Sequence, residues 1–416
     1  MSEPRRMLVF DSAYTHRMMV ERNLSSIVCG RDLDGFFEHV WTCHPVASLF
    51  LDDSDPGKFG PPDVIGLAPR HTLVEGRIGA SRRLRRLFPL NFLIAQVRLV
   101  RMLLKLAREQ RISIVRAEDS WYNGLLAWIV ARRCRLPLMI AVWGNPGAIR
   151  ARTGKPLMPR LFRKIWVEEM VERFVLRRAD RVVTLDEDDR SFVISQGAPR
   201  EKTRIFRIGN VLHETHFTEP SERQGGLAEL EAIGAGGAET LMCISRLEAL
   251  KFTDHLVRIL GILKDRRPRA KVLFVGDGAQ KEELAALASE LGVADRVVFC
   301  GNRDQDWLAR VLPHVSVVVS PLTGRALAEA ALGGAPIVAY DLVWHREMVI
   351  PGETGEIVPN LDVEAMAEAV DRLLADPHRA RRLGDAVRRH AFAMLDPAAA
   401  DRVQKEAYQE LLAERA

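Results

Sequence analysis

The sequence predicts an α/β protein made of two doubly wound domains, and three observations support this prediction. The chain has 416 residues, which is more than one hydrophobic core usually organises, so two domains are expected. In both halves, short β-branched runs alternate with longer helical patterns, as in a parallel sheet covered by helices on both faces. Residues 218–239 are rich in Gly, Ser, Glu and Ala without a strand pattern, so they are expected to form a linker or hinge with one short helix.

The expected strands fall into two series. The first series is RRMLVFDS, FFEHVWTCHPVA, ISIVRA, LPLMIAVWG and RVVTLD, and the second is TLMCIS, KVLFVGDG, RVVFCG, VSVVVSP and PIVAYD. We therefore expect a first domain at residues 1–217, a second at 218–392, and a C-terminal helix at 393–416 that returns to the first domain. Two such domains would face each other across a cleft, and ligands of parallel sheets bind outside the carboxyl ends of the strands.

Composition and cysteine placement indicate a cytoplasmic protein. A hydrophobic fraction of 47% with 28% charged residues is ordinary for a folded chain. The five cysteines are scattered without CxxC spacing, which favours reduced thiols over disulfides or a zinc site. The N-terminus lacks the pattern of a secretion signal. The longest apolar stretch, residues 91–107, is interrupted by three basic residues, so no transmembrane span is expected.

Positive charge is concentrated from Gly79 to Arg111. The formal net charge is only +5, yet this segment holds nine arginines or lysines and one glutamate. Four arginines lie in Arg82–Phe88, and in a helix over 91–108 four more basic residues share one stripe: Arg98, Arg101, Lys105 and Arg108. A surface of this kind, from Arg82 to Arg111, suits an anionic membrane, but a buried helix whose arginines reach solvent explains the pattern equally well. No nucleic acid partner is expected, because no binding motif accompanies the patch.

In the second half, polar and glycine residues follow three separate strands. Arg246 and Lys251 follow TLMCIS, a Gly-Asp-Gly turn follows KVLFV, and Thr323 and Gly324 follow VSVVV with Glu329 on the next helix. Because the carboxyl ends of parallel strands share one edge, these groups are expected to lie together. Two cations, a glycine turn and a helix N-terminus are suited to a diphosphate, and a carboxylate beside them would meet ribose hydroxyls.

Several stretches carry a family resemblance. They are ISRLEALKFTDHLV, VLFVGDGAQKEELAALASELGVADRVVFCGN and IPGETGEIVPNLDVEAMAEAVDRLLADP in the second half, with VERFVLRRADRVVTLDE and TRIFRIGNVLHETHF in the first. These stretches resemble the GT-B-fold glycosyltransferases of the large retaining group called family 4, most strongly over residues 241–383. The resemblance implies two Rossmann-like domains facing across a cleft.

The resemblance also implies an activity and a set of donor-binding residues. The implied enzyme is a retaining hexosyl-type glycosyltransferase that moves a sugar from a nucleotide-diphosphate donor to a hydroxyl of a glycan or lipid-linked acceptor, with no metal and no further cofactor. Arg246 and Lys251 would hold the donor diphosphate, and Glu329 would accept hydrogen bonds from the ribose. The other implied donor contacts are Gly276, Gly278, Arg303, Thr323, Gly324 and Arg325.

The sequence departs from the family at three places. Pro321 occupies the position of the first of two glutamates, which leaves the choice of sugar, and activity itself, open. SAYTH replaces a glycine pair after the first strand, where Tyr14 and His16 are acceptor-side candidates. RAEDSWYNG replaces a histidine-bearing strand end and supplies three further candidates, Glu118, Asp119 and Trp121; Asp119 is predicted to act catalytically. An acidic first turn of the next helix explains these acids equally well.

The sequence also bears on functions other than sugar transfer. A non-catalytic GT-B relative that binds nucleotide or a partner transferase remains the alternative. A dinucleotide-dependent oxidoreductase is not expected, because VFDSAYTH lacks the GxGxxG turn after the first strand. DEDDR at Asp186–Arg190 is interpreted as a helix start rather than a metal site, and HETH at His213–His216 lacks the spacing of a zinc hydrolase. The expected location is the cytoplasm, with peripheral attachment to the inner face of the cytoplasmic membrane.

Overall fold

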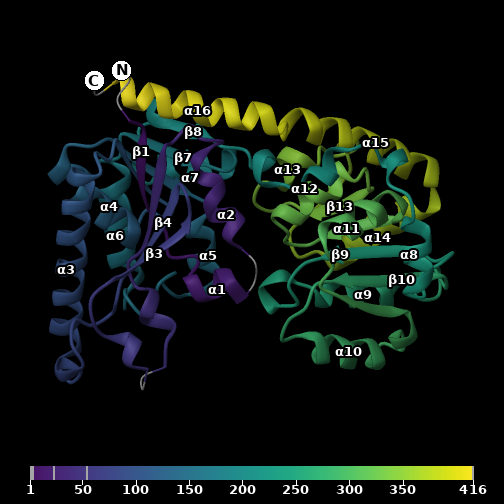
Figure 1. The fold of residues 1–416 in the computed structure, drawn as a ribbon. Helices are drawn as coiled ribbons and strands as arrows, with labels where there is room; N and C mark the ends of the chain where they lie inside the picture. The colour runs from purple at the N-terminus through teal and green to yellow at the C-terminus, as the bar shows by residue number, and fades with distance from the viewer. Residues whose placement is uncertain (1–3, 22–23, 53–54, 415–416) are drawn as a thin grey trace. The chain divides into compact units, whose positions relative to one another are not determined.

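The computed structural model describes residues 4–21, 24–52 and 55–414. Its contacts divide the chain into two compact units. The first unit combines Met1–Phe206 with Ala399–Ala416, and the second is Arg207–Ala398. Each unit is a sheet with helices on both faces (Figure 1).

The first unit contains an eight-stranded sheet with the order β3-β4-β2-β1-β5-β6-β7-β8, in which only β3 is antiparallel to its neighbour. The strands are β1 Arg6–Phe10, β2 His39–His44, β3 Asp63–Ala68, β4 His71–Glu75, β5 Ile114–Ala117, β6 Leu138–Val142, β7 Arg181–Thr184 and β8 Thr203–Ile205. The α-helices of this unit are α1 His16–Glu21, α2 Ser25–Cys29, α3 Phe88–Glu109, α4 Tyr122–Cys134, α5 Pro146–Thr153, α6 Ile165–Leu176 and α7 Glu187–Ser195.

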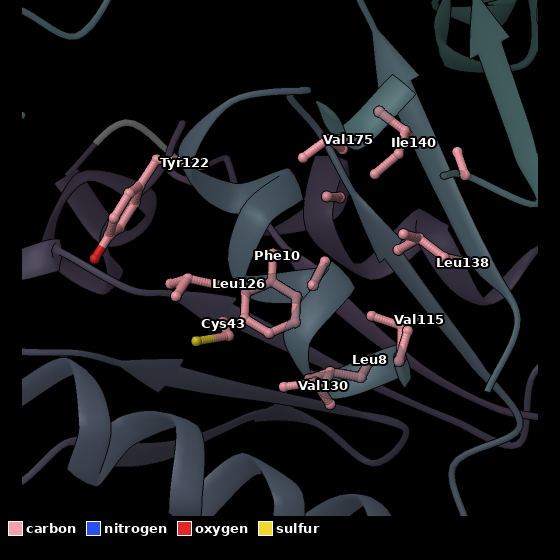
Figure 2. Packing of buried hydrophobic residues seen from close by; sticks show 14 of the residues in the cluster. Leu8, Phe10, Cys43, Val115, Tyr122, Leu126, Val130, Leu138, Ile140 and Val175 are labelled. Carbon is pink, nitrogen blue, oxygen red and sulfur yellow. The ribbon is translucent and has the colours of Figure 1, made fainter. Parts of the chain in front are cut away.

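The central strands of this sheet are apolar on both faces, because helices cover both. In β1, Leu8 and Phe10 point into one core, and Met7 and Val9 point into the core on the other face. Figure 2 shows Leu8, Phe10 and side chains of neighbouring strands packing with α4 residues of the first core. Both cores bury their β1 side chains completely, which fixes the register of the sheet and hence the level at which each strand ends.

A helix from the far end of the chain completes the second of these cores. α16 (Pro397–Ala413) counts with the first unit from Ala399 onward. Its Tyr408 is fully buried against Phe37, with ring centroids 5.0 Å apart, and its hydroxyl accepts a hydrogen bond of 2.7 Å from Arg116 Nη1 on β5. Leu411 packs in the same cluster.

The second unit contains a six-stranded, fully parallel sheet with the order β11-β10-β9-β12-β13-β14. Its strands are β9 Glu239–Ile244, β10 Ala270–Val275, β11 Val297–Gly301, β12 Val317–Ser320, β13 Ile337–Tyr340 and β14 Glu356–Val358. Its helices are α8 Gly226–Ala232, α9 Asp254–Leu263, α10 Lys281–Glu290, α11 Gln305–Val311, α12 Arg325–Leu332, α13 His345–Met348, α14 Val363–Ala375 and α15 Pro377–Met394.

The α/β class and all ten expected strands are confirmed. Four strands were not expected: β3, β4, β8 and β14. β8 and β14 have only three residues each, and β3 is a largely exposed edge strand without a clear period-two apolar pattern. Residues 218–239 contain the expected short helix, α8, but the segment packs within the second unit, where Leu230 joins the core and Arg223 is buried. No helix among the described residues combines the length and apolar character needed to cross a bilayer.

Candidate active site

The loop after β9 carries the two predicted cations. The side chain of Arg246 is 71% exposed, and its Nη1 lies 2.8 Å from Glu248 Oε1. Lys251 ends a short 3-10 turn, Ala249–Lys251, immediately before α9. Burial and, more weakly, the charge of Lys251 lower the pKa of His345, which places this ammonium group near the β13 side of the same edge. Both cations therefore lie at the carboxyl edge of the second sheet.

The glycine turn after β10 is required by its neighbour, the β9 loop. Gly276 has φ 134°, and a Cβ on it would lie 2.1 Å from the carbonyl oxygen of Ser245. A Cβ on Gly278 would lie 2.4 Å from the carbonyl oxygen of Leu247. The Leu247 amide donates to the Asp277 carbonyl at 3.0 Å, so the two loops are joined backbone to backbone. The glycines thus fix the loop that carries Arg246.

The strand beyond β10 places Arg303 at the same edge. Arg303 follows β11, its Nε donates to the Cys300 carbonyl at 3.0 Å, and its guanidinium lies 5.1 Å from the centroid of the Trp307 ring. These contacts hold an exposed arginine in a defined position beside the start of α11. It borders the turn formed by Gly276 and Gly301, whose backbones pair at 2.9 Å.

The turn after β12 leads into α12 and is held by hydrogen bonds from buried side chains. The hydroxyl groups of Ser320 and Thr323 are hydrogen-bonded to each other in the buried interior of the turn. The Thr323 carbonyl accepts from His345 Nε2 at 3.0 Å, and His345 Nδ1 lies 2.9 Å from the Tyr340 carbonyl. Gly324 stands at the N-cap of α12, exposed, with no atom within 4 Å of where a Cβ would be. The amides at the start of α12 are thus open to an anion.

Glu329 lies on α12 and is 4% exposed. Burial raises the pKa of its carboxyl group, while the Arg325 guanidinium and the Gln305 amide oppose that rise. Arg325 Nε lies 3.0 Å from Glu329 Oε1. The carboxylate is therefore buried but balanced by a cation and an amide donor, an arrangement that suits recognition of neutral hydroxyl groups.

Two residues that the sequence did not point to, Gln305 and His216, support Glu329. Gln305 begins α11, and its Oε1 lies 2.7 Å from Nε2 of His216, a fully buried side chain. Burial lowers the pKa of His216 to about 4, so the ring is neutral and donates from Nε2. Gln305 then directs its NH2 group to Glu329. The motif HETH was the available signal, but its partner lies in a distant part of the chain.

Pro321 is buried directly after β12, eight positions before Glu329. With a pyrrolidine ring there, this strand end offers no carboxylate toward the ligand side, in contrast to the pattern expected from the resemblance. All nine donor-side residues predicted from the sequence nevertheless follow four adjacent parallel strands, β11, β10, β9 and β12.

The acceptor-side candidates follow β1 and β5, which are neighbours in the first sheet. The ring of Tyr14 packs against the small core that contains Met19 and Leu73. The backbone amide of His16, the first residue of α1, donates to Glu75 Oε1 at 2.6 Å. Trp121 stands before α4 and packs partly against the first core.

Asp119 is engaged by the start of α4. Its Oδ1 accepts from the backbone amides of Trp121 and Asn123 at 3.0 and 3.1 Å, and its Oδ2 accepts from the Asn123 side chain. Burial raises the pKa of Asp119 to about 7 against these hydrogen bonds. The side chain thus occupies the helix-start position that the sequence offered as the second explanation, and a catalytic role for it stays a prediction.

Glu118 belongs to a network of paired charges. Arg116 Nε lies 2.8 Å from its Oε1, and Trp143 Nε1 donates to its Oε2 at 2.6 Å. Beside it, Asp11 directly follows β1 and pairs with Arg31. Burial, the largest single influence, acts to raise the pKa of Asp11, but the charge and hydrogen bond of Arg31 together with the Ala13 amide lower it overall. The acid after β1 was a visible signal for Asp11; Arg31 and Trp143 reach this edge only through the fold.

A second acidic motif is structural. Asp186 caps α7, and its Oδ1 accepts from the Asp189 amide at 2.8 Å. Asp189 Oδ2 accepts from the Gly144 amide at 2.8 Å. This confirms the interpretation of DEDDR as a helix start. Among the described residues, no three His, Cys, Asp or Glu side chains are grouped closely enough to hold a metal ion.

Comparison with known proteins agrees with this geometry. The family "Glycosyl transferases group 1" matches residues 231–390, and "Glycosyl transferase 4-like domain" matches residues 43–209. The chain is 36% identical over 173 residues to the GDP-mannose-dependent alpha-(1-6)-phosphatidylinositol monomannoside mannosyltransferase of Mycolicibacterium smegmatis, covering 39% of this chain and 45% of that protein. It is 30% identical over 281 residues to the D-inositol 3-phosphate glycosyltransferase of Nocardia farcinica, covering 64% and 59% of the two chains. The matched segments thus span about half of these relatives.

Solved structures show the same fold along almost the whole chain. Anabaena HepE in complex with UDP and glucose aligns with a TM-score of 0.70 at 18% identity, covering 98% of this chain and 100% of that chain. Sucrose-phosphate synthase from Thermosynechococcus elongatus aligns with a TM-score of 0.72 at 20% identity, covering 99% and 100%. The two family models together match most of the chain, and the fold is that of GT-B enzymes. The chain therefore belongs to the GT-B glycosyltransferases of group 1.

Proposed function

We propose that this protein transfers a sugar from a nucleotide-diphosphate donor to a hydroxyl of a glycan or lipid-linked acceptor, with retention of configuration at the sugar carbon. The observation that carries the proposal is the edge of the second sheet. There, two adjacent strands, β9 and β12, are followed by Arg246 and Lys251 and by the start of α12 with the buried Glu329. The group 1 family membership supports the same reaction class.

The proposed chemistry follows from where charge develops. Breaking the bond between the sugar carbon and the phosphate oxygen builds negative charge on the leaving diphosphate. Arg246 and Lys251 and the amides of α12 stabilise that charge more in the transition state than in the ground state. The departing phosphate oxygen takes the proton of the acceptor hydroxyl on the same face of the sugar, which yields retention. These cations neutralise the diphosphate, so the proposal needs no metal ion and no further cofactor.

Donor selection is divided between the two ends of the nucleotide sugar. Glu329, held by Arg325 and Gln305, accepts from the ribose hydroxyls, and Arg303 flanks the base. Near the sugar, Pro321 replaces the carboxylate that would bind sugar hydroxyls. A donor whose recognition depends less on hydroxyl contacts at that point therefore fits the site better.

The acceptor side is supported by the relatives. The M. smegmatis enzyme is named for phosphatidylinositol monomannoside and the N. farcinica enzyme for D-inositol 3-phosphate, so both names contain a phosphate-bearing inositol. We therefore place the acceptor of this chain among phosphate-bearing or lipid-linked alcohols. The reaction would take place in the cytoplasm, at the inner face of the cytoplasmic membrane.

One alternative has a specific observation in its favour. Glu118, Asp119 and Asp11 are all engaged by neighbours, and Pro321 removes a carboxylate, which would suit a relative that binds nucleotide without transferring sugar. Both functions require nucleotide binding, and only the first requires turnover.

A thermal-shift panel of UDP, GDP, CMP and TDP tests the donor site. A nucleotide at a hundred times its dissociation constant stabilises the protein by about 2.7 kcal/mol. Arg246→Ala should reduce the shift, whereas Arg382→Ala, on the exposed face of α15, should leave it unchanged. If no nucleotide raises the melting temperature, both proposed functions are contradicted. A shift without hydrolysis or transfer of the matching nucleotide sugar would favour the non-catalytic alternative.

A further inference from the structure

The start of α3 exposes apolar side chains to solvent. Leu90, Leu93 and Val97 recur at three- and four-residue spacing and share one face of the helix, and Leu87 and Phe88 precede them. These five side chains are 39% to 59% exposed. We call Leu90, Leu93 and Val97 the α3 apolar face, because Phe88, two positions before Leu90, points about 200° away around the helix and lines the cavity described below. An apolar patch of this kind, on one helix face, marks a binding surface more often than scattered single residues do.

The orientation of this face is fixed by buried polar anchors on the opposite side of α3. Asn91 is fully buried, and its Oδ1 accepts from the Ala80 and Ser81 amides at 2.7 and 3.0 Å. Gln96 donates to the Arg77 carbonyl at 3.1 Å. If the helix turned to bury its apolar face, these hydrogen bonds would break and buried amide groups would be left without partners. The face is therefore held outward.

Positive charge surrounds the α3 apolar face. Four exposed arginines stand just before the helix, and four exposed basic residues follow on its later turns: Arg82, Arg83, Arg85, Arg86, Arg98, Arg101, Lys105 and Arg108. The one acid of the segment, Glu109, pairs with Lys105 at 3.7 Å. An apolar centre with a basic border is complementary to an anionic bilayer surface, whose interior is apolar and whose headgroups are negative.

A cavity of about 840 Å³ opens beside the start of α3. It lies at the carboxyl edge of the first sheet, between the loops that follow β2 and β4, and Arg85 and Phe88 form part of its wall. Its charged lining is Lys58, Arg85 and Arg160 against Asp52, and the rest of its wall is apolar.

Two of these cations are held in place by the cavity wall. Lys58 Nζ donates to the Leu51 carbonyl at 2.9 Å, and Arg160 Nη1 donates to the Leu49 carbonyl at 3.2 Å. The cavity therefore combines two exposed arginines, Arg85 and Arg160, with apolar walls, the composition that an amphiphile with an anionic head requires.

We propose that this protein docks on anionic bilayers through the α3 apolar face and that the adjoining cavity binds the headgroup and upper chains of one anionic lipid. The leucines enter the acyl boundary, the border of basic residues pairs with surrounding headgroups, and Arg85 and Arg160 bind the phosphate of the lipid in the cavity. If the protein transfers sugar as proposed above, the lipid in the cavity is its acceptor. Only this identification of the lipid as the acceptor rests on the proposed function; the docking on the bilayer does not.

Vesicle co-sedimentation of the full chain tests this proposal. We expect binding to vesicles of phosphatidylcholine with about 30% phosphatidylglycerol and little binding to pure phosphatidylcholine. Binding should be lost near 0.5 M salt, where the Debye length is only about 4 Å. Equal binding to both compositions would overturn the proposal. So would full displacement by soluble glycerol 3-phosphate at the same headgroup concentration, since the ligand would then be a free phosphate.

Matched variants locate the surface. Leu90→Ser with Leu93→Ser should weaken binding about tenfold, and Leu227→Ser with Ile262→Ser, exposed residues of the second unit, should not weaken it. Arg85→Gln with Arg160→Gln should weaken it about twenty-fivefold, at about a factor of five for each cation. The control pair is Arg132→Gln with Arg133→Gln, exposed at the end of α4 near the opposite edge of the same sheet. Equal losses in a control and its test pair would refute the assignment.

One further measurement separates lipid binding from the donor site. The thermal shift with the preferred nucleotide should be unchanged in the Leu90/Leu93 and Arg85/Arg160 variants, because these residues lie in the first unit. A variant that loses both lipid binding and the nucleotide shift would indicate general damage to the fold, and the assignment of the surface would then fall.

Discussion

The strand-end edges of the two sheets use charge in opposite ways. On the first sheet, Asp11 pairs with Arg31, Glu118 pairs with Arg116, and Asp119 is held by backbone amides. On the second sheet, Arg246 is exposed and the start of α12 has no side-chain cap among the described residues. The acids of the first edge are buried with their partners, whereas on the second edge Arg246 stays exposed to solvent although it is paired with Glu248.

This difference suggests a division of labour. A diphosphate is common to all nucleotide-diphosphate sugars, so an edge with a solvent-exposed arginine can serve any of them. An acceptor must be distinguished by shape, and an edge whose acids are engaged by partners leaves that task to neighbouring surfaces such as the cavity beside α3. The following predictions test the contrast between the two edges, beginning with the largest expected effect.

Removing a cation from the second edge should affect turnover most. Arg246→Ala should lower kcat by about a hundredfold to a thousandfold, or about 3 to 4 kcal/mol, because the lost charge acts mainly on the leaving diphosphate. The measurement is the transfer or hydrolysis rate at saturating donor. Arg258→Ala, an exposed arginine paired with Asp254 on α9, is the matched control. A variant at position 246 with unchanged kcat would remove this residue from the site.

Changing the buried carboxylate should weaken donor binding. Glu329→Gln keeps the size of the side chain but removes a charged acceptor. The free energy of nucleotide binding should therefore become less favourable by about 1.5 to 3 kcal/mol, which raises the Kd. Isothermal titration with the nucleotide found in the panel gives the value. Glu248→Gln, which alters only the partner of Arg246, should have a smaller effect. The reverse order would mean that the ribose is bound elsewhere.

On the first edge, the same kind of substitution should affect stability rather than binding. Asp119→Ala removes the acceptor at the start of α4 and should cost about 1 to 2 kcal/mol of unfolding free energy. Nucleotide Kd should not change. Loss of turnover with an unchanged Tm would instead support the catalytic role predicted from the sequence.

The pH dependence of Asp119 has a definite sign. Its folded pKa of about 7 lies above the unfolded value of about 3.9, so the folded state binds the extra proton between these values. Its contribution to stability is present below about pH 4 and is lost as pH rises toward 7. Asp119→Asn should flatten this part of the stability profile in urea unfolding, and an unchanged slope would contradict the assignment.

The smallest effect is expected at the support of Glu329. His216 has a folded pKa of about 4, below the ordinary pKa of histidine near 6.5, so the unfolded state binds more protons between these values. Its contribution to stability is complete above about pH 6.5 and is lost as pH falls toward 4, the opposite direction to Asp119. His216→Gln should remove this slope, and Gln305→Ala should weaken nucleotide binding by about 1 kcal/mol or less.

The fold was largely predictable because its signals are local. The β-branched runs of β9, β10 and β12 are bounded by glycine or polar residues, so strand, strand end and following helix could be read from one segment each. The donor-side residues follow from the same signals, since each stands directly after a strand. Strand β3 could not be predicted, because its residues are largely exposed and do not show a regular alternation of apolar and polar side chains.

The parts that could not be predicted depend on contacts between distant segments. Nothing near Glu329 in the sequence indicates Gln305, and nothing near Gln305 indicates His216. Gly276 and Gly278 were assigned to a close approach of the nucleotide, but the contact the structure gives them is with the backbone of the β9 loop. A glycine in a sequence reveals a close approach and not what approaches.

The position of α16 has a consequence for biosynthesis. Ala407, Tyr408 and Leu411 fill a core whose other buried members all lie before residue 207, so that core stays incomplete until the end of the chain has left the ribosome. At typical rates of synthesis, the intervening second unit takes roughly ten to forty seconds to make. During that interval Phe36 and Phe37 lack their aromatic partner, and the nascent first unit would be a client for chaperones.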